Sequence, residues 1–229
     1  MPIITVYAHK GGQGVTTTAA TLALLHAHTH HHTLLIDTTG DQAALLNVTV
    51  ENQPGYPDYV SCPGLTLDDI TTPVTGYLDL TATSAHVPGI HGSGAAAVHD
   101  GHSYGMITGA LDAYDTVIID CAPGAHSWIA YADHRILVTR PCYLALHRAI
   151  QQPRPDHLVV ITEAGRALTP TDIQTALGTP ITATVPYDPD IARTLDAGLL
   201  ATRPPRALTR PLRPLLTATS RTRSSEVVA

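Results

Sequence analysis

Short apolar runs recur along the chain, and several of them end at an acidic or polar residue. The clearest are residues 3–7 (IITVY), 33–37 (TLLID) and 116–120 (TVIID), and weaker examples cover residues 77–82, 135–139, 157–162 and 180–185. Runs of this length without a polar face are typical of buried parallel strands. Between them lie stretches with helical character, at residues 19–27, 106–113, 141–150 and 170–177 and after residues 188–190. This alternation predicts an α/β fold, a single doubly wound and mainly parallel sheet flanked by helices.

Two stretches do not follow the alternation. Residues 47–76 are rich in Pro, Gly and Asn, and only residues 65–70 have helical character. Residues 87–105 are rich in Gly, Ala and His and have the composition of a loop. We expect the first stretch to be a surface excursion and the second to be irregular.

A glycine-rich loop joins the first strand to the first helix. It reads Lys10-Gly11-Gly12-Gln13-Gly14-Val15 and is followed by Thr16, Thr17 and a third threonine. Glycines let backbone N–H groups turn inward, and a helix N-terminus adds partial positive charge, which is the layout of a phosphate cradle. A threonine hydroxyl at the start of such a helix can bind Mg²⁺. The alternative is a glycine turn at a strand–helix junction that holds no ligand.

Two aspartates stand where such a cradle needs acidic groups. Asp37 ends the second strand, and Asp120 ends the strand at residues 116–120. Ligands of open parallel sheets bind at the carboxyl ends of the strands, so both acids are expected near the glycine loop. An acid in the position of Asp120 can hold Mg²⁺ through water.

These segments together resemble the deviant Walker A and Walker B motifs of the ParA/MinD family of P-loop ATPases, over residues 2–200. The family runs K-G-G-x-G-K-T-T in the first motif and Y-D-x-x-I-I-D-x-x-P in the second, which residues 114–123 match as YDTVIIDCAP. Lys10 falls on the family's signature lysine, which contacts the nucleotide of a partner subunit. The resemblance implies an ATP·Mg²⁺ site in a sandwich homodimer. Its cofactor-binding residues would be Gly11, Gly12, Gln13, Gly14, Val15, Thr16, Thr17 and Pro186, its metal site Thr16, Asp37 and Asp120, and its catalytic residues Lys10, Asp37 and Asp41.

The chain departs from the family at two positions that hydrolysis uses. Val15 replaces the lysine that reaches the β- and γ-phosphates, and Thr39 replaces the second acid of the D-x-D-P-Q segment, so Asp41 could serve only if the loop shifts. We therefore expect ATP binding with weak hydrolysis. Lys10 is the chain's only lysine and so the only lysine that could replace the missing charge at position 15. Arg140 is another candidate, but no sequence motif supports it. The family often reads adenine with an Asn where this chain has Thr162 and Glu163, which leaves the base preference open.

Composition limits the remaining possibilities. The chain of 229 residues is 44% apolar and has no run of about 18 apolar residues, so we expect no transmembrane segment. Residues 1–3 lead straight into the first strand, so we expect no signal peptide either. Three widely separated cysteines, Cys62, Cys121 and Cys142, argue against a disulfide framework or a zinc site and fit a reducing cytosol. The five histidines within residues 26–32 are expected to be a polar helix end, with a transition-metal site as the alternative.

Charge divides the chain into two predicted units, a nucleotide-binding domain at residues 1–200 and a basic segment at residues 201–229. The basic segment has a net charge of +5 and the whole chain a net charge of −6, so the domain has a net charge of −11. Its cations, which would bind DNA without sequence preference, are Arg203, Arg206, Arg210, Arg213, Arg221 and Arg223. Leucines at 208, 212, 215 and 216 have the spacing of a membrane-binding amphipathic helix, but Pro211 and Pro214 are expected to interrupt it.

The resemblance and the charge pattern together predict a cytoplasmic, nucleoid-associated protein of the ParA type. It would dimerise around ATP·Mg²⁺, bind non-specific DNA and act in DNA partitioning with a ParB-like adaptor. Two alternatives stay open. One is a nucleotide-dependent scaffold or filament that hydrolyses little, and the other is a MinD-like protein that positions cell division at the membrane.

Overall fold

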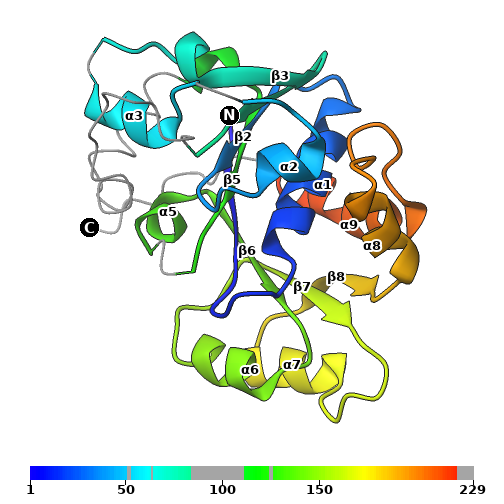
Figure 1. The fold of residues 1–229 in the computed structure, drawn as a ribbon. Coiled ribbons are helices and arrows are strands. Elements are labelled where there is room, and N and C mark those ends of the chain that lie inside the picture. The colour runs from blue at the N-terminus through cyan, green and yellow to red at the C-terminus, as the bar shows by residue number, and fades with distance from the viewer. Residues whose placement is uncertain (51–52, 63, 84–110, 124–125, 221–229) are drawn as a thin grey trace, which may run out of the picture.

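A single sheet of eight strands runs through the part of the chain that the computed structural model describes, residues 1–50, 53–62, 64–83, 111–123 and 126–220 (Figure 1). Its order is β3-β4-β2-β5-β1-β6-β7-β8, and all neighbours are parallel except β3 and β4. The strands are β1 Ile3–Tyr7, β2 Thr33–Asp37, β3 Thr71–Thr75, β4 Leu78–Thr81, β5 Thr116–Asp120, β6 His134–Thr139, β7 His157–Thr162 and β8 Ile181–Pro186. The doubly wound, mainly parallel sheet expected from the sequence is confirmed.

Helices cover both faces of this sheet (Figure 1). One face carries α1 Val15–Ala27, α2 Gln42–Leu46, α8 Pro189–Asp196 and α9 Arg206–Ala218. The other carries α3 Tyr56–Ser61, α5 His126–Tyr131, α6 Tyr143–Ala149 and α7 Pro170–Leu177. Short 3₁₀ turns occur at Asp68–Ile70 and Leu111–Ala113. Each face therefore has its own hydrophobic core, and α1 is buried throughout residues 18–27 because α9 packs over it.

The strand register brings the carboxyl ends of the central strands together. Val6 of β1 and Asp37 of β2 both pair with Asp120 of β5. The loops that follow β1, β2 and β5 therefore meet at one edge of the sheet, where ligands of open α/β folds bind.

Several elements differ from the sequence expectation. The first helix begins at Val15 rather than at residue 19, because Gly14 already accepts the helical hydrogen bond from the Thr18 N–H at 3.0 Å. The expected surface excursion contains α3 and β3, and α5 was not expected at all. Of the helix expected at residues 106–113, only the 3₁₀ turn is described, and residues 106–110 and 87–105 lie outside the described residues.

The prediction that prolines interrupt the last amphipathic segment is wrong. Helix α9 runs through Pro211 and Pro214, each of which removes one backbone donor. Leu208, Leu212 and Leu215 offset that loss because they are buried against α1 and β8 in the same core. In its described part, the segment after residue 200 thus packs onto the domain. No helix in the described ranges is long and apolar enough to cross a membrane.

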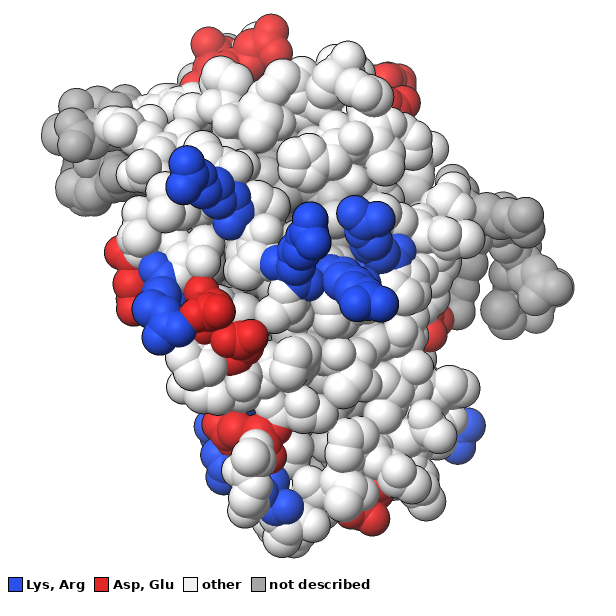
Figure 2. Space-filling model, turned by 90° about the vertical axis from the view of Figure 1, so that its right-hand side faces the viewer, with Lys and Arg blue, Asp and Glu red and all other residues white. Residues whose placement is uncertain are grey.

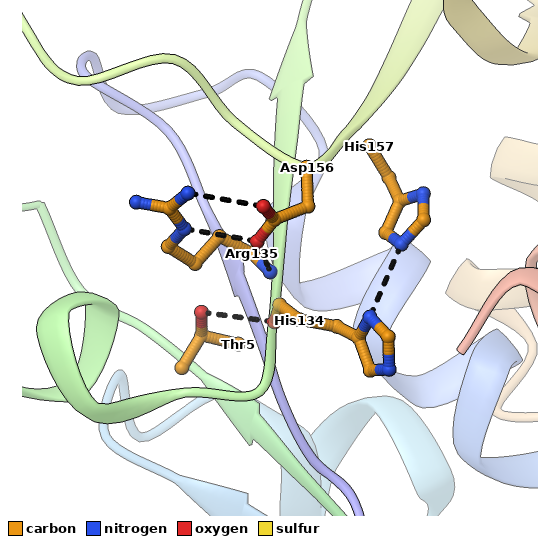
Figure 3. A network of polar contacts seen from close by, with 5 residues as sticks. All are labelled: Thr5, His134, Arg135, Asp156 and His157. Carbon is orange, nitrogen blue, oxygen red and sulfur yellow. Dashed lines mark hydrogen bonds and ion pairs between the residues drawn. The ribbon is translucent and has the colours of Figure 1, made fainter. Parts of the chain in front are cut away.

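The opposite edge of the sheet holds a polar network between the amino ends of β6 and β7 (Figure 3). Arg135 donates two hydrogen bonds to Asp156, at 2.9 and 3.0 Å, in a bidentate ion pair. His157 Nε2 lies 3.3 Å from His134 Nδ1, and Thr5 Oγ1 donates to the His134 carbonyl at 3.5 Å. These contacts join β1, β6 and β7, so this edge stabilises the sheet.

Candidate nucleotide-binding site

The loop between β1 and α1 has the backbone geometry of an anion cradle. Gly12 and Gly14 have φ of 76° and 91°, in the left-handed region that favours glycine. A Cβ on Gly14 would lie 2.4 Å from Ile161 Cδ1 of β7, so a larger residue would have to displace the end of the Ile161 side chain as well as adopt an unfavourable φ. The loop therefore lies close to the sheet edge, with the N-terminus of α1 directly behind it.

A cavity of about 420 Å³ opens in front of this loop. Its lining contains Gly11, Gly12, Gln13, Gly14, Val15 and Thr16 from the cradle, together with Lys10, Thr39, Asp41, Cys121, Pro123 and Arg140. The sequence-predicted cradle residues are thus brought together, and Lys10 and Asp41 join them.

A smaller and more apolar cavity of about 130 Å³ adjoins the first one, since Gly14 and Arg140 line both. Its walls are Thr17 and Thr18 of α1, Ile161, and the segment from Val185 to Asp188, with residues of α8 and α9 closing it. Pro186 stands in this wall, apart from the cradle. The arrangement suits a ligand with a polyanionic part and a flat apolar part.

Asp37 is buried and holds its own loop in place. Its Oδ1 accepts hydrogen bonds from the backbone N–H of Thr39 and of Gly40, both at 2.8 Å. Its Oδ2 accepts from the Gln42 N–H at 3.0 Å. This carboxylate therefore closes the turn between β2 and α2, and that role occupies both of its oxygens.

Asp120 is as deeply buried as Asp37, but only one of its two carboxylate oxygens accepts hydrogen bonds. Its Oδ2 accepts hydrogen bonds from Thr39 Oγ1 and Gln42 Nε2, both at 2.9 Å. Its Oδ1 has no partner among the described residues. Burial, followed by the nearby Asp37 carboxylate, raises the pKa of Asp120 to about 6, so the charged form is destabilised until a cation approaches.

Thr39 links the two acids. Its hydroxyl lies 2.8 Å from Asp37 Oδ1 and 2.9 Å from Asp120 Oδ2, although it has only one proton to donate. The residue that replaces the family's second acid therefore bridges the carboxylates, where another carboxylate would repel them.

The donor set suits a hard cation such as Mg²⁺. The partnerless Asp120 oxygen and the Thr16 hydroxyl are oxygen ligands at the N-terminus of α1, beside the larger cavity. Asp37 is less available, because its oxygens accept three hydrogen bonds from backbone N–H groups. Among the predicted metal residues, Thr16 and Asp120 thus have the geometry that fits best.

Two glutamines hold this site, and sequence reasoning missed Gln42 entirely and the structural role of Gln13. Gln42 is fully buried, and its Nε2 donates to the Thr16 carbonyl at 3.0 Å as well as to Asp120. Gln13 was assigned only to the cofactor, yet its Oε1 accepts from the Arg140 N–H at 2.9 Å. The signal for Gln42 was the final Gln of D-x-D-P-Q, which this chain carries one residue late.

The basic residues lie on a different face, over α9 (Figure 2). Arg203, Arg206, Arg210 and Arg213 are exposed and form no ion pair within the described residues. Arg221 and Arg223 lie outside the described residues. The larger cavity and this basic face are therefore separate features of the molecule.

The histidine-rich stretch does not form a metal centre in the described part of the chain, where no group of three or more His, Cys, Asp or Glu is placed to hold an ion. His26 is buried in α1, and neither of its ring nitrogens has a partner there. Burial, and then the nearby His31, lowers its pKa to about 4. The three cysteines are free, and Cys121 is buried.

No family model matches the chain, and no curated protein matches it in sequence. Solved structures do match it over nearly its whole length. They include the septum site-determining protein MinD from Pyrococcus horikoshii in complex with Mg-ADP, at 20% identity and a TM-score of 0.74 over 93% of each chain. A ParA family ATPase from Chlorobium tepidum is 22% identical with a TM-score of 0.76, over 92% of this chain and 95% of that one. The MinC:MinD cell division protein complex from Aquifex aeolicus gives 17% identity and a TM-score of 0.74, over 95% of this chain and 96% of that one.

These neighbours are ParA/MinD-family ATPases, and the likeness establishes that the chain has the ParA/MinD P-loop NTPase fold. The fold inferred from the glycine loop and the strand that ends at Asp120 is confirmed. The interpretation of residues 10–17 as a deviant Walker A motif with Val15 in place of the lysine remains a prediction.

Proposed function

We propose that this chain binds ATP·Mg²⁺ in the two adjoining cavities and dimerises when it does so. The observation that carries the proposal is the glycine cradle at the start of α1, which faces a 420 Å³ cavity beside the partnerless Asp120 oxygen. The triphosphate would lie against the cradle, where N–H groups and the helix N-terminus stabilise negative charge. The base would lie in the apolar cavity beside Pro186 and Tyr187. The Mg-ADP complex of the Pyrococcus horikoshii neighbour supports this assignment.

The metal would be held by Thr16 and Asp120. Mg²⁺, when bound there, would neutralise part of the phosphate charge. Thr39 and Gln42 fix one Asp120 oxygen, so the other is the one left for the ion. Binding would relieve the unfavourable burial of two neighbouring carboxylates.

Hydrolysis is proposed to be slow. Val15 offers no charge to the γ-phosphoryl group, and the Thr39 hydroxyl is occupied by two carboxylates. Asp41 lines the cavity and is the acid best placed to orient a water, since Asp37 is committed to its own turn. Slow turnover would favour a long-lived nucleotide-bound state.

Lys10 is proposed to act across a dimer interface. Its Nζ donates to the Gly11 carbonyl at 3.4 Å, a weak contact on the exposed rim of the cradle. The rim continues into α6, where Tyr143 and Leu144 are 73% and 45% exposed and Arg148 Nη1 donates to the His9 carbonyl at 3.3 Å. Exposed apolar side chains beside the nucleotide cavity suit an interface between two copies of the chain.

The bound dimer is proposed to act in DNA partitioning with an adaptor of the ParB kind, and the exposed arginines of α9 would contact DNA phosphates. The membrane alternative has less support, because the leucines of α9 are buried in the protein core and are not free to enter a lipid surface. A ParA family ATPase among the structural neighbours is compatible with the partitioning role.

Light scattering of the wild type and Lys10→Ala, with and without ATP and Mg²⁺, tests the proposed dimer. We expect the wild type to double in mass with saturating ATP and Lys10→Ala to stay monomeric. Arg154→Ala is the control variant, since Arg154 lies away from the cavity linings. A wild type that remains monomeric with ATP bound would contradict the dimer.

A further inference from the structure

The larger cavity is short of positive charge for the ligand proposed here. Lys10 and Arg140 are the only cationic side chains that line it in the described part of the chain. Lys10 sits on the exposed rim and contacts the Gly11 carbonyl, while Val15 at the start of α1 is neutral. A triphosphate buried against this wall therefore needs a cation from another element.

Arg140 is fixed to the cradle through its backbone. It follows the last residue of β6, and its N–H donates to Gln13 Oε1 of the glycine loop at 2.9 Å. Gln13 itself is 3% exposed, so this contact is held rigidly. The base of the Arg140 side chain thus keeps a constant position relative to the cradle.

The Arg140 side chain lies where the two cavities meet. Together with Gly14 it lines both, which is the place where the phosphates of a nucleotide would join its nucleoside. The guanidinium carbon lies 6.0 Å from the centre of the Tyr187 ring in the apolar wall. Its Nε is buried and has no acceptor among the described residues. A buried donor without a partner beside a cavity is a place for an anionic ligand atom.

The existing partner of Arg140 holds it loosely. Arg140 Nη1 lies 3.6 Å from Glu163 Oε1, which is longer than a hydrogen bond. The other Glu163 oxygen is bound tightly by Arg166, whose Nε and a second guanidinium nitrogen both contact Oε2. If Arg140 turned to a phosphate, Glu163 would keep a cationic partner.

We propose that Arg140 is the phosphate-binding cation that compensates, from the residue after β6 and within the same subunit, for the valine at position 15. In the free protein the Arg140 guanidinium lies near Glu163, and on nucleotide binding it would contact the phosphates instead. This inference rests on the proposed nucleotide binding and adds to it a residue that the glycine-loop motif does not contain.

Calorimetric titration with ATP in MgCl₂ tests the role of Arg140. A charged hydrogen bond of ordinary strength corresponds to a loss of affinity of about 10- to 100-fold in Arg140→Gln. Binding of adenosine, which has no phosphate, is expected to change less than about twofold. Arg154→Gln is the matched control, because Arg154 is exposed, lines neither cavity and forms no ion pair within the described residues.

Two further variants make the test specific. Val15→Lys added to Arg140→Gln is expected to recover most of the lost ATP affinity, because positions 15 and 140 both line the larger cavity and a cation at either one would offset the charge of the triphosphate. Glu163→Gln is expected to tighten ATP binding about two- to fivefold by freeing Arg140, and this gain should vanish in the Arg140→Gln background. The single Glu163 variant decides the matter even if Arg140→Gln does not fold.

The outcomes separate this inference from the function on which it rests. If the wild type binds ATP and Arg140→Gln binds it equally well, the role of Arg140 is wrong and the proposed function stands. Failure of Val15→Lys to recover affinity, or unchanged binding in Glu163→Gln, would also overturn the inference. A wild type that binds no ATP overturns both.

Discussion

At the scale of single residues, the site is organised by two acids that the fold buries side by side. Asp37 is satisfied by its own loop, whereas Asp120 keeps one oxygen without a partner in the described structure. Such an oxygen costs stability in the free protein and gains it back when a cation binds. The sequence predicted both acids at this edge, but only the structure shows that the loop takes up both oxygens of Asp37 and leaves one oxygen of Asp120 without a partner.

Asp120→Asn is therefore expected to stabilise the free protein and to abolish its response to the ligand. Since the pKa of Asp120 is raised from 3.8 to about 6, its ionised form costs on the order of 3 kcal/mol at neutral pH. Without metal or nucleotide, the Tm of the variant should exceed that of the wild type by roughly 6–12 °C. Mg²⁺ with ATP should raise the Tm of the wild type only.

Thermal unfolding in EDTA and in Mg²⁺ with ATP measures both effects. Asp112→Asn is the control variant, because Asp112 is exposed and far from the cavity lining. If Asp120→Asn is less stable than the wild type in EDTA, the charge of Asp120 does not destabilise the free protein.

A second prediction at this scale concerns the contribution of His26 to the pH dependence of stability. Burial lowers its pKa from 6.5 to about 4 in the folded state, so the unfolded chain binds more protons between these values. Its contribution is therefore complete above pH 6.5 and is lost as the pH falls towards 4, by up to about 3 kcal/mol. His157, whose pKa is also lowered chiefly by burial, acts in the same direction.

Denaturant unfolding at pH 7 and pH 5 measures this loss. His26→Leu should flatten the pH dependence, because the buried imidazole has no hydrogen bond to lose. His28→Gln, at an exposed position, should leave the dependence unchanged. An identical slope in His26→Leu and the wild type would assign the pH dependence to other groups.

At the scale of secondary structure, α9 combines two surfaces with different roles. Its leucines join the core against α1 and β8, while Arg206, Arg210 and Arg213 face solvent. Arg206 begins the helix, where the helix dipole disfavours a cation. The exposure of these three arginines, which form no ion pair within the described residues, is compatible with the proposed contact to DNA phosphates.

Replacing Arg206, Arg210 and Arg213 together by Gln is expected to weaken DNA binding by at least tenfold and to reduce its salt dependence by about three released counterions. The fold should keep its stability, since only exposed residues change. Deleting residues 201–229 would be a poor test, because it also removes the buried leucines. Fluorescence anisotropy with unrelated DNA duplexes at several salt concentrations is the measurement.

Arg154→Gln provides the control, since Arg154 lies outside α9, both cavities and the proposed dimer interface. A loss of DNA affinity per removed charge equal to that of the triple variant would mean that binding follows net charge alone. Stronger binding of the wild type to anionic vesicles than to DNA would instead support the membrane alternative.

The element scale also shows how far sequence patterns reach. Strands β2 and β7 and helix α7 have the bounds expected from sequence, because apolar runs and a Thr-Pro helix start are local signals. Helices α3 and α5 escaped notice since their stability depends on tertiary contacts, such as the Tyr56–Trp128 ring pair at 5.4 Å. The same limit explains the site, where the cradle is local but Gln42 and Arg140 enter it only through the fold.

At the scale of the whole molecule, the two opposite edges of the sheet have different roles. One edge holds the cradle and both acids, and the other holds the ion pair of Arg135 and Asp156 that joins β6 to β7 (Figure 3). The basic face of α9 is connected to the ligand site, because Leu208 of that helix lines the apolar cavity while its neighbours on the surface are arginines. A bound nucleotide would thus contact the same helix that presents the positive charge.

Nucleotide binding is the claim on which the dimer, the role of Arg140 and the connection to α9 all depend. Calorimetric titration of the wild type with ATP, with and without Mg²⁺, tests it most directly. We expect saturable binding that strengthens with Mg²⁺ and weakens about tenfold or more in Thr16→Ala, while Thr209→Ala, outside both cavities, binds like the wild type. The absence of binding at millimolar ATP, or binding that neither Mg²⁺ nor Thr16→Ala alters, would contradict the account.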